Sequence, residues 1–596
     1  MKQLLTGNEA IARGAWEGGV HFASAYPGTP STEILENLAG YGEIDAEWAP
    51  NEKVALEAAM GAAVAGGRSI SAMKHVGVNV AADPLFTFSY TGTNGGIVLV
   101  SADEPGQHSS QNEQDNRNYA KFAKIPMLEP SDSQECKDMV IQALEISETF
   151  DSPVLLRTTT RVNHSKSVVE CGERNEQPIK TYTKNIQKYV TVPAFAREMR
   201  KKVEMRTGKL LEFSEATSLN RIENGGKKTG VIASGMCYNY AREVFGDTVS
   251  YLKLGFTWPL PSKLIRSFCR SLETIYVIEE NDAYIEEAVT MLGFSCKGKN
   301  SLPHFGELTP DIIRTALLGQ ARDTIAFDGS LVIPRPPALC AGCPHRGFFY
   351  ETGRRKNVIV AGDIGCYTLG FSEPYNAMDF NFCMGASFSA GHGAQKILNR
   401  LKGNDKRVVA VLGDSTFFHT GMNSLLEVVY NNSSTVCVIL DNAITGMTGH
   451  QNNPGNGLNA RGDIANRTSI EEVVRALGVK NIAVINPNDI AEVKKNLDWA
   501  LALKEPSVII ARWPCVLKRI TAAEKEEYQN PFAGTCLVNE EKCIGCKICI
   551  RSGCPALSFD AEKKKARIDP VQCVGCAVCG QLCPKEAIAV AIKEGA

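Results

Sequence analysis

Residues 408–450 read VVAVLGDSTFFHTGMNSLLEVVYNNSSTVCVILDNAITGMTGH. The segment opens with an apolar strand, turns at Gly413-Asp414-Ser415 and continues into a helix-like run at 421–430. A second apolar strand then ends at Asp441-Asn442. A strand that passes through a glycine turn into a helix, and then into another strand, is the repeating unit of a parallel α/β sheet. We therefore expect a buried parallel sheet here.

The turn at residues 413–415 lies where parallel sheets bind phosphate groups. Amides at the start of the helix face the anion, and glycine allows it to approach closely. The Asp414 carboxylate and the Asn442 amide oxygen end neighbouring strands, and they suit a hard Mg²⁺ ion that also takes phosphate oxygens. The alternative is an ordinary α/β turn with a solvated aspartate.

The whole chain has 596 residues, enough for three to five domains at roughly 100 to 200 residues each. Its 64 Lys and Arg residues against 66 Asp and Glu leave a formal charge of -2, which gives no electrostatic reason to expect nucleic acid or a membrane surface. The N-terminus lacks the pattern of a secretory signal, and no apolar stretch approaches the roughly 20 residues that span a bilayer. We expect a cytoplasmic protein.

Alternating helical and β-rich patterns divide the chain into α/β blocks. A polar, Lys-rich stretch after about residue 165 predicts a connection with an exposed helix, and the proline-rich VIPRPPA at 332–338 predicts a linker. The last sixty residues repeat a cysteine motif at a spacing of thirty, as a separate small domain would. The expected divisions are 1–165, 166–228, 229–330, 335–520 and 533–596.

Cysteines are concentrated in the tail, where nine of the 20 lie between Cys536 and Cys583. Two C-x-x-C-x-x-C triplets are each followed by Cys-Pro, a pattern that wraps three corners of a [4Fe–4S] cubane while the distant fourth cysteine binds the other cluster. The predicted sets are Cys543, Cys546, Cys549 with Cys583, and Cys554 with Cys573, Cys576, Cys579. Four residues, one more than in the usual ferredoxin pattern, separate Cys549 from Cys554. Zinc sites and disulfides are the alternatives, and Cys536 is interpreted as an ordinary cysteine.

The segment at 408–450 also resembles the thiamine diphosphate enzymes, whose signature is Gly-Asp-Gly followed at a distance by Asn. Ser415 replaces the last glycine here. The resemblance implies that Asp414, Asn442 and the carbonyl of Ile444 hold Mg²⁺, with Gly413 and Ser415 at the diphosphate. It also implies that Gly385-Ala386-Ser387 forms the turn under the thiazolium ring, with tight helix–sheet packing as the alternative. His419 is a candidate donor to substrate or diphosphate, or a core residue.

Near the N-terminus, YPGTPST at 26–32 resembles a signature of the 2-oxoacid:ferredoxin oxidoreductases. NEKVALEAAMGAAVAGG at 51–67 resembles their segment with the catalytic glutamate, which corresponds to Glu52; Glu57 is the competing candidate. Such a carboxylate hydrogen-bonds the aminopyrimidine ring of the cofactor. The resemblance also implies that Thr29 contacts substrate. His75, in a loop that lines the family's active site, is either a substrate contact or a structural histidine.

The order of blocks resembles the alpha subunits of the indolepyruvate:ferredoxin oxidoreductases over essentially the whole chain. This resemblance implies an α/β protein with two thiamine-diphosphate-binding parallel-sheet domains, a transketolase C-terminal-like domain and a small α+β two-cluster ferredoxin domain. It implies oxidative decarboxylation of aryl pyruvates, such as indole-3-pyruvate, with coenzyme A, giving arylacetyl-CoA and CO₂ while electrons pass through [4Fe–4S] clusters to ferredoxin. It further implies a smaller beta subunit in an α₂β₂ assembly and an anaerobic host.

Related oxidoreductases also bind a third, proximal cluster, whose ligands would here be Cys340, Cys343, Cys366 and Cys515. The alternative is a cysteine turn beside the cofactor and two buried thiols. Two competing functions stay open. One is a related oxidoreductase or thiamine decarboxylase that acts on a different 2-oxoacid. The other is a cluster-carrying electron-transfer subunit with a vestigial thiamine fold, although the joint presence of Glu52, Asp414 and Asn442 argues against it.

Overall fold

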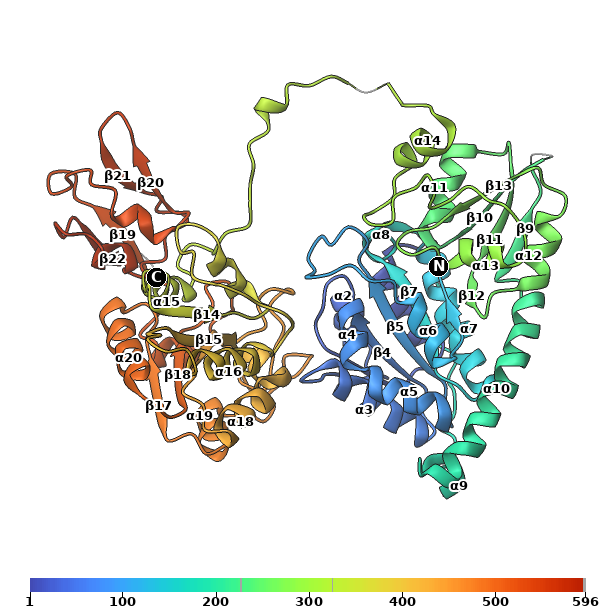
Figure 1. Cartoon of the computed structure of the whole chain (residues 1–596), viewed down its shortest axis with the longest axis horizontal. Coiled ribbons are helices and arrows are strands. Elements are labelled where there is room, and N and C mark those ends of the chain that lie inside the picture. Colours follow the sequence, from blue (N-terminus) through green and yellow to red (C-terminus); the bar gives the residue numbers. More distant parts are fainter. Residues whose placement is uncertain (226–227, 324, 593–596) are drawn as a thin grey trace. The chain divides into compact units, whose positions relative to one another are not determined.

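The computed structural model describes residues 1–225, 228–323 and 325–592. The chain divides into two compact units, Met1–Phe327 and Asp328–Ala596, and each is described by itself (Figure 1). Residues 226–227 of the predicted connecting segment, 324 of the predicted middle domain and 593–596 of the predicted tail lie outside the described residues. Within the described ranges, no helix is both long and apolar enough to cross a membrane.

The first unit is built on a seven-stranded sheet in the order β12-β6-β7-β5-β4-β2-β3. Its strands are β2 (Phe22–Ala25), β3 (Asp45–Trp48), β4 (Ser69–Lys74), β5 (Ile97–Asp103), β6 (Met127–Leu128), β7 (Val154–Thr159) and β12 (Phe256–Trp258). All neighbours pair in parallel except β12 with β6. Every residue of β4, β5 and β7 is buried, as in a parallel sheet with helices on both faces. The expected parallel sheet is confirmed.

Eight helices connect the strands of this sheet or flank it: α1 (Gly7–Glu17), α2 (Thr32–Leu38), α3 (Glu52–Val64), α4 (His75–Val80), α5 (Ala82–Thr91), α6 (Arg117–Ala123), α7 (Ser133–Phe150) and α8 (Thr160–His164). Side-chain caps fix where the longer helices begin: Thr6 at α1, Asn51 at α3 and Asp132 at α7 each accept a backbone N–H of the first turn. A separate antiparallel pair joins β1 (Lys2–Thr6) to β8 (Lys166–Glu170).

A second sheet in the same unit has the order β13-β10-β11-β9. Its strands are β9 (Asn220–Glu223), β10 (Thr229–Ser234), β11 (Ser250–Leu254) and β13 (Thr274–Ile278), with only β9 antiparallel. The accompanying helices are α9 (Ile186–Tyr189), α10 (Pro193–Ala216), α11 (Gly235–Phe245), α12 (Ser262–Cys269), α13 (Tyr284–Met291) and α14 (Pro310–Leu318). Strand β12 follows β11 in the chain yet extends the first sheet, so backbone hydrogen bonds tie the two blocks together.

The second unit contains a five-stranded, all-parallel sheet in the order β14-β15-β16-β18-β17. Its strands are β14 (Val358–Ala361), β15 (Arg407–Gly413), β16 (Val436–Asp441), β17 (Asn481–Ile485) and β18 (Ser507–Arg512). Along β15, Val409 and Val411 join one apolar core while Val408, Ala410 and Leu412 join the other. The strands expected from the apolar runs are therefore present, and both faces of the sheet are covered.

Helices α15 (His345–Thr352) and α20 (Ile490–Ala502) supply side chains to one core. The other core takes side chains from α16 (Ser387–Leu398), α18 (Met422–Tyr430) and α19 (Ile470–Ala476). Shorter helical turns are η1 (Gly329–Leu331), η2 (Cys366–Phe371), α17 (Asp414–Thr416), the π-helical η3 (Phe417–Gly421) and α21 (Ala522–Glu527).

The cysteine-rich tail forms two antiparallel pairs, β19 (Gly534–Val538) with β22 (Ile588–Ile592), and β20 (Leu557–Asp560) with β21 (Lys565–Ile568). Two short helices, η4 (Cys549–Ser552) and α22 (Val578–Gln581), complete it. Its apolar core is small and consists largely of cysteine, alanine, leucine and isoleucine. Such a core is marginal by itself, so the tail depends on bound groups or on packing against its neighbour.

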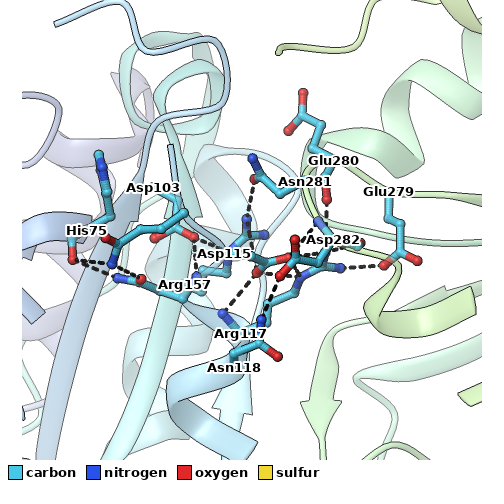
Figure 2. A network of polar contacts seen from close by, with 12 residues as sticks. His75, Asp103, Asp115, Arg117, Asn118, Arg157, Glu279, Glu280, Asn281 and Asp282 are labelled. Carbon is cyan, nitrogen blue, oxygen red and sulfur yellow. Dashed lines mark hydrogen bonds and ion pairs between the residues drawn. The ribbon is translucent and has the colours of Figure 1, made fainter. Parts of the chain in front are cut away.

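A buried ionic network lies between the two sheets of the first unit (Figure 2). Arg117 contacts the carboxylate of Asp115 and, with Nη1 2.6 Å from Oε2, that of Glu279 after β13. Arg157 on β7 lies 2.7 Å from Asp103 and 2.6 Å from Glu129. All these side chains are nearly inaccessible, so removing one partner would leave an uncompensated buried charge.

Glu280 is buried beside this network, and its Oε1 accepts the N–H of Leu308 at 3.0 Å. Burial raises the pKa of Glu280 from 4.5 to about 7. The folded state therefore holds this proton more tightly than the unfolded state. The stability that results is fully present below the unfolded pKa and is lost as the pH rises through about 7.

We predict that Glu280→Gln, which keeps an acceptor for Leu308 but cannot ionise, becomes more stable relative to wild type as the pH rises. The relative gain between about pH 5.5 and pH 8 should be about 2 kcal/mol, measured by calorimetric unfolding of the first unit in the intact protein. Glu273→Gln is the matched control, because Glu273 is exposed and pairs with Lys228 at the surface. Equal pH dependence in both variants would contradict the prediction.

Candidate functional site

Three predicted catalytic residues follow neighbouring strands of the seven-stranded sheet. Thr29 lies in the loop after β2, Glu52 begins α3 after β3, and His75 begins α4 directly after β4. Strands β4, β2 and β3 are adjacent and parallel, so their carboxyl ends meet at one edge. Ligands of parallel α/β sheets bind at such edges. The structure therefore brings these three segments together.

Glu52 is buried, with 6% of its surface exposed. The Asn51 side chain accepts the Val54 N–H at 2.9 Å and so fixes the start of the helix at Glu52. Gly77 on α4 makes room for the carboxylate, because a Cβ there would come within 2.8 Å of Glu52 Oε1. Glu57, the competing candidate, is exposed and pairs with Lys53 on the helix surface. A buried carboxylate at Glu52 suits acid–base chemistry better than this solvated pair.

His75 is fully buried, and its Nε2 lies 3.2 Å from both the backbone oxygen and the side-chain oxygen of Asn112. Its own carbonyl accepts hydrogen bonds from Asn116 and Gln114, so it holds the loop after β5. Thr29 is half-buried. Contact of either residue with a substrate stays a prediction.

A buried ion pair at the same edge was not singled out from the sequence. Lys74 Nζ, at the end of β4, lies 3.2 Å from Glu104 Oε2, just after β5. Burial lowers the pKa of Lys74, and the charge of Glu104 opposes that change. The sequence signal that could have indicated this ion pair is a lysine at the very end of a buried strand.

In the second unit, four neighbouring strands are each followed by a candidate site residue, and three of these residues were predicted from the sequence. Asp363 follows β14, Asp414 follows β15, Asn442 follows β16, and Cys515 lies shortly after β18. These strands are adjacent and parallel, so the four segments share the carboxyl edge of the sheet.

Asp414 is buried, and its Oδ2 accepts the side-chain N–H of Asn453 at 3.0 Å. Burial, followed by the charge of Asp441, raises the pKa of Asp414 to about 8. Asp441 itself pairs with Arg512 at 2.7 Å. An ionised Asp414 therefore needs a nearby positive charge, and its carboxylate with the Asn442 amide oxygen is the kind of oxygen donor set that Mg²⁺ takes.

The turn from Asp441 to Ile444 is held by its own side chains. Ala443 N–H donates to Asp441 Oδ1 at 3.2 Å, and Ile444 N–H donates to Asn442 Oδ1 at 3.3 Å. Ala443 has a φ of 59°, which is uncommon for a residue with a Cβ and often marks a functional site. Ser415 accepts a hydrogen bond from Thr445 at 2.9 Å and so joins this turn to the one after β15.

Asp363 is a site residue that sequence reasoning missed. Its two carboxylate oxygens accept the N–H groups of Gly385 and Ser387, each at 2.9 Å, and Ile364 N–H adds a bond of 2.7 Å. Asp363 therefore fixes the Gly385-Ala386-Ser387 turn at the start of α16. The Ser387 side chain is buried beside the same carboxylate and also hydrogen-bonds Asp363. The available signal was a Gly-Asp after an apolar strand, as at Gly413-Asp414.

His419 lies on the π-helical turn after Asp414 and is 3% exposed. Its Nδ1 is 3.2 Å from Thr420 Oγ1, which in turn donates to Met384 O at 2.9 Å beside the Gly385 turn. Single π-helical turns within helices are frequent at functional sites. The contacts place His419 next to the turn expected under the thiazolium, while donation to a ligand stays a prediction.

Each predicted set of tail cysteines lines a cavity of its own. Cys543, Cys546, Cys549 and Cys583 line the first cavity, and Cys554, Cys573, Cys576 and Cys579 line the second. Cys536, interpreted from the sequence as an ordinary cysteine, is buried at the second cavity, where its N–H donates to Cys573 Sγ at 3.2 Å. Such N–H···S bonds tune iron–sulfur clusters. Ligation of clusters by the two sets stays a prediction.

The four other candidate cysteines also converge. Burial raises the pKa of Cys366 to about 11, and the charges of Cys515 and Cys340 add to that rise. Burial also raises the pKa of Cys343, and the charges of Cys366 and Cys340 contribute to this second rise. Among the residues with described positions, no group of three or more His, Cys, Asp or Glu side chains is arranged to hold a single metal ion.

Three protein-family models match parts of the chain. They are "Pyruvate flavodoxin/ferredoxin oxidoreductase, thiamine diP-bdg" at residues 13–222, "Thiamine pyrophosphate enzyme, C-terminal TPP binding domain" at 363–511, and "4Fe-4S dicluster domain" at 542–587. With the parallel sheets, they confirm the expected fold class.

Similar proteins include "Indolepyruvate oxidoreductase subunit IorA" of Pyrococcus horikoshii, 42% identical over 98% of this chain and 96% of that protein. The protein of the same name from Methanothermobacter marburgensis is 41% identical over 98% of this chain and 97% of the relative. A solved 2-oxoglutarate:ferredoxin oxidoreductase from Magnetococcus marinus, with 2-oxoglutarate, coenzyme A and succinyl-CoA bound, superposes with a TM-score of 0.45 and 19% identity, over 53% of this chain and 65% of that chain.

Proposed function

The chain belongs to the family of indolepyruvate oxidoreductase IorA subunits, and from that premise we propose that it catalyses oxidative decarboxylation of aryl pyruvates, such as indole-3-pyruvate. Coenzyme A takes the acyl group, giving arylacetyl-CoA and CO₂, and electrons leave through [4Fe–4S] clusters to ferredoxin. The observation that carries the proposal is the presence of a thiamine-type strand edge and two cysteine-lined cavities within one compact unit. A decarboxylase without electron transfer has no use for such cavities.

The donor groups at the carboxyl edge of the five-stranded sheet fit thiamine diphosphate with Mg²⁺. Asp414, Asn442 and the Ile444 carbonyl would hold the metal, and Gly413 and Ser415 would face the diphosphate at the start of α17. The raised pKa of Asp414, which a cation would reverse, supports this assignment. When bound, thiamine diphosphate supplies the carbon nucleophile and the electron sink for decarboxylation.

Glu52 would hydrogen-bond the aminopyrimidine ring and hold the proton that this ring exchanges during catalysis. Its burial favours a strong, directional hydrogen bond over solvation by water. Thr29 would orient the substrate carboxylate or carbonyl. We propose that His75 and His419 are polar groups near the substrate. His75 would keep its contact with Asn112, and His419 would keep its contact with Thr420.

Cys340, Cys343, Cys366 and Cys515 would hold a third cluster close to the cofactor. Supporting this, Cys515 N–H donates to the Asn442 carbonyl at 3.0 Å, and the loop at 445–449 passes Cys366, since a Cβ on Gly446 would lie 3.5 Å from its Sγ. A cluster there would stand between the metal-binding turn and the tail cavities. Electrons would then cross the unit in short steps.

The relatives are named as subunits, which supports a partner chain. We propose a smaller beta subunit in an α₂β₂ assembly, with ferredoxin as the external electron acceptor. We also propose a cytoplasmic location. Because exposed iron–sulfur clusters are sensitive to oxygen, we propose an anaerobic host.

The test of the substrate compares 2-oxoacids with protein purified anaerobically together with its partner subunit. Viologen reduction in the presence of coenzyme A should show kcat/KM for indole-3-pyruvate at least about tenfold above that for pyruvate, since burying an aromatic ring contributes a few kcal/mol. A preference for pyruvate or 2-oxoglutarate would assign the chain to a different substrate.

Glu52→Gln should lose turnover by about a hundredfold or more, because it removes the proton-holding carboxylate. Thiamine diphosphate and iron contents should stay unchanged. Glu57→Gln is the matched control, with the same chemical change on an exposed position of the same helix, and should keep near-normal activity. Near-normal turnover of Glu52→Gln would refute the assignment.

The third cluster is tested by counting iron. Holoprotein with three clusters should carry about twelve iron atoms per chain, and the double substitution of Cys366 and Cys515 by Ser should remove about four. Cys383→Ser, at an exposed cysteine of the same block, should remove none. About eight iron atoms in the wild type, with the same number in the double variant, would show that only the two tail clusters are present and would contradict the third cluster.

A further inference from the structure

Arg346 is a fully buried arginine in the first turn of α15, with 1% of its surface exposed. Its Nη1 donates to the Ser552 carbonyl at 2.9 Å and to the Tyr375 hydroxyl. Its Nη2 donates to the carbonyls of Leu339 and Cys340 at 2.9 and 2.7 Å. Each of these four acceptors is electrically neutral.

The charge of Arg346 therefore lacks a compensating anion in the part of the chain that the structure describes. In the described residues its side-chain partners are these neutral groups and no carboxylate, and its Nε has no hydrogen-bond partner. Burying an unpaired charge is expensive, and a positive charge in the first turn also opposes the helix dipole. A sequence that retains arginine here implies a negative group nearby that is not part of the polypeptide.

The surroundings identify where that negative group would lie. Arg346 lines the second tail cavity together with Cys554, Cys573, Cys576 and Cys579. Burial raises the pKa of Cys576, and the charge of Arg346 opposes that rise. Gly342, in the Cys340–Cys343 loop, has a φ of 72°, and a Cβ there would come within 2.1 Å of Val574 between Cys573 and Cys576. The guanidinium thus sits where this loop meets the cavity.

We propose that Arg346 is the buried counter-charge of the cluster in the second cavity and raises its reduction potential. The inference rests on the proposed function, which supplies the cluster. A [4Fe–4S] cluster with four thiolates is a net anion, and it gains another negative charge when it accepts one electron. A fixed cation in a dry environment stabilises the reduced form more than the oxidised form. Arg346 is a tuning residue and takes no part in the bond-making steps.

The first cavity provides the contrast. It is lined by Lys547 and Lys585, both of which are exposed to solvent. Water and salt screen their charges, so they should affect the potential of their cluster much less. Lys585→Gln is therefore a matched control for removing one positive charge beside a cluster.

The experiment is a redox titration of the intact, anaerobically purified protein, followed by EPR, with iron measured on the same samples. In Arg346→Gln one midpoint potential should move clearly to more negative values while the others stay in place. In Arg346→Lys, which keeps the charge, and in Tyr375→Phe, which removes only a hydrogen-bond partner, that midpoint should stay close to wild type. Lys585→Gln should give a smaller shift than Arg346→Gln.

Unchanged midpoints in Arg346→Gln with full iron, or an equal shift in Arg346→Lys, would overturn the proposal. If Arg346→Gln loses a cluster, full iron content in Arg346→Lys supports the proposed counter-charge. Loss of the cluster in both variants overturns the proposal. Wild-type protein without tail clusters would instead refute the proposed function. The two failures are thus distinguished by the iron content of the wild type.

Discussion

The guanidinium of Arg346 and the hydroxyl of Tyr375 both donate to the carbonyl of Ser552, at 2.9 and 2.7 Å, and so join the cysteine-rich tail to the five-stranded sheet. Gln581 adds a second anchor at the start of α20, with bonds to Ile490 N–H and Asn488 O. The tail has too small a core to hold a fixed position alone. Its cavities therefore keep their place beside the Cys340–Cys343 loop through hydrogen bonds to Arg346 on α15, to Tyr375 after η2 and to the start of α20.

The seven-stranded sheet of the first unit and the five-stranded sheet of the second unit present their candidate site residues in the same way. In each, adjacent parallel strands deliver polar residues to a common carboxyl edge: Thr29, Glu52 and His75 in the first unit, and Asp414 and Asn442 in the second. Buried groups then fix the turns between strand and helix, as Asp363 does for the Gly385 turn. Asp363 accepts three backbone N–H groups, so the fold itself sets the geometry of this turn.

Much of the fold and many of the candidate site residues could be predicted from the sequence, because their signals are local. Apolar runs marked β15 and β16, and the cysteine triplets indicated two interleaved sets whose members line separate cavities. What sequence reasoning missed depends on contacts between distant segments. The pairing of β12 with β6 has no local pattern, because a short edge strand can join any free edge. The roles of Asp363 and Arg346 likewise follow from burial against residues far away in the chain.

The function proposed for this chain couples decarboxylation to electron exit. Anaerobic holoprotein mixed with indole-3-pyruvate and coenzyme A, without ferredoxin, tests it most directly when freeze-quenched samples are followed by EPR and CO₂ is measured in parallel. We expect signals of reduced clusters to appear together with CO₂ and in proportion to it. Release of CO₂ while every cluster stays oxidised would contradict the proposed coupling.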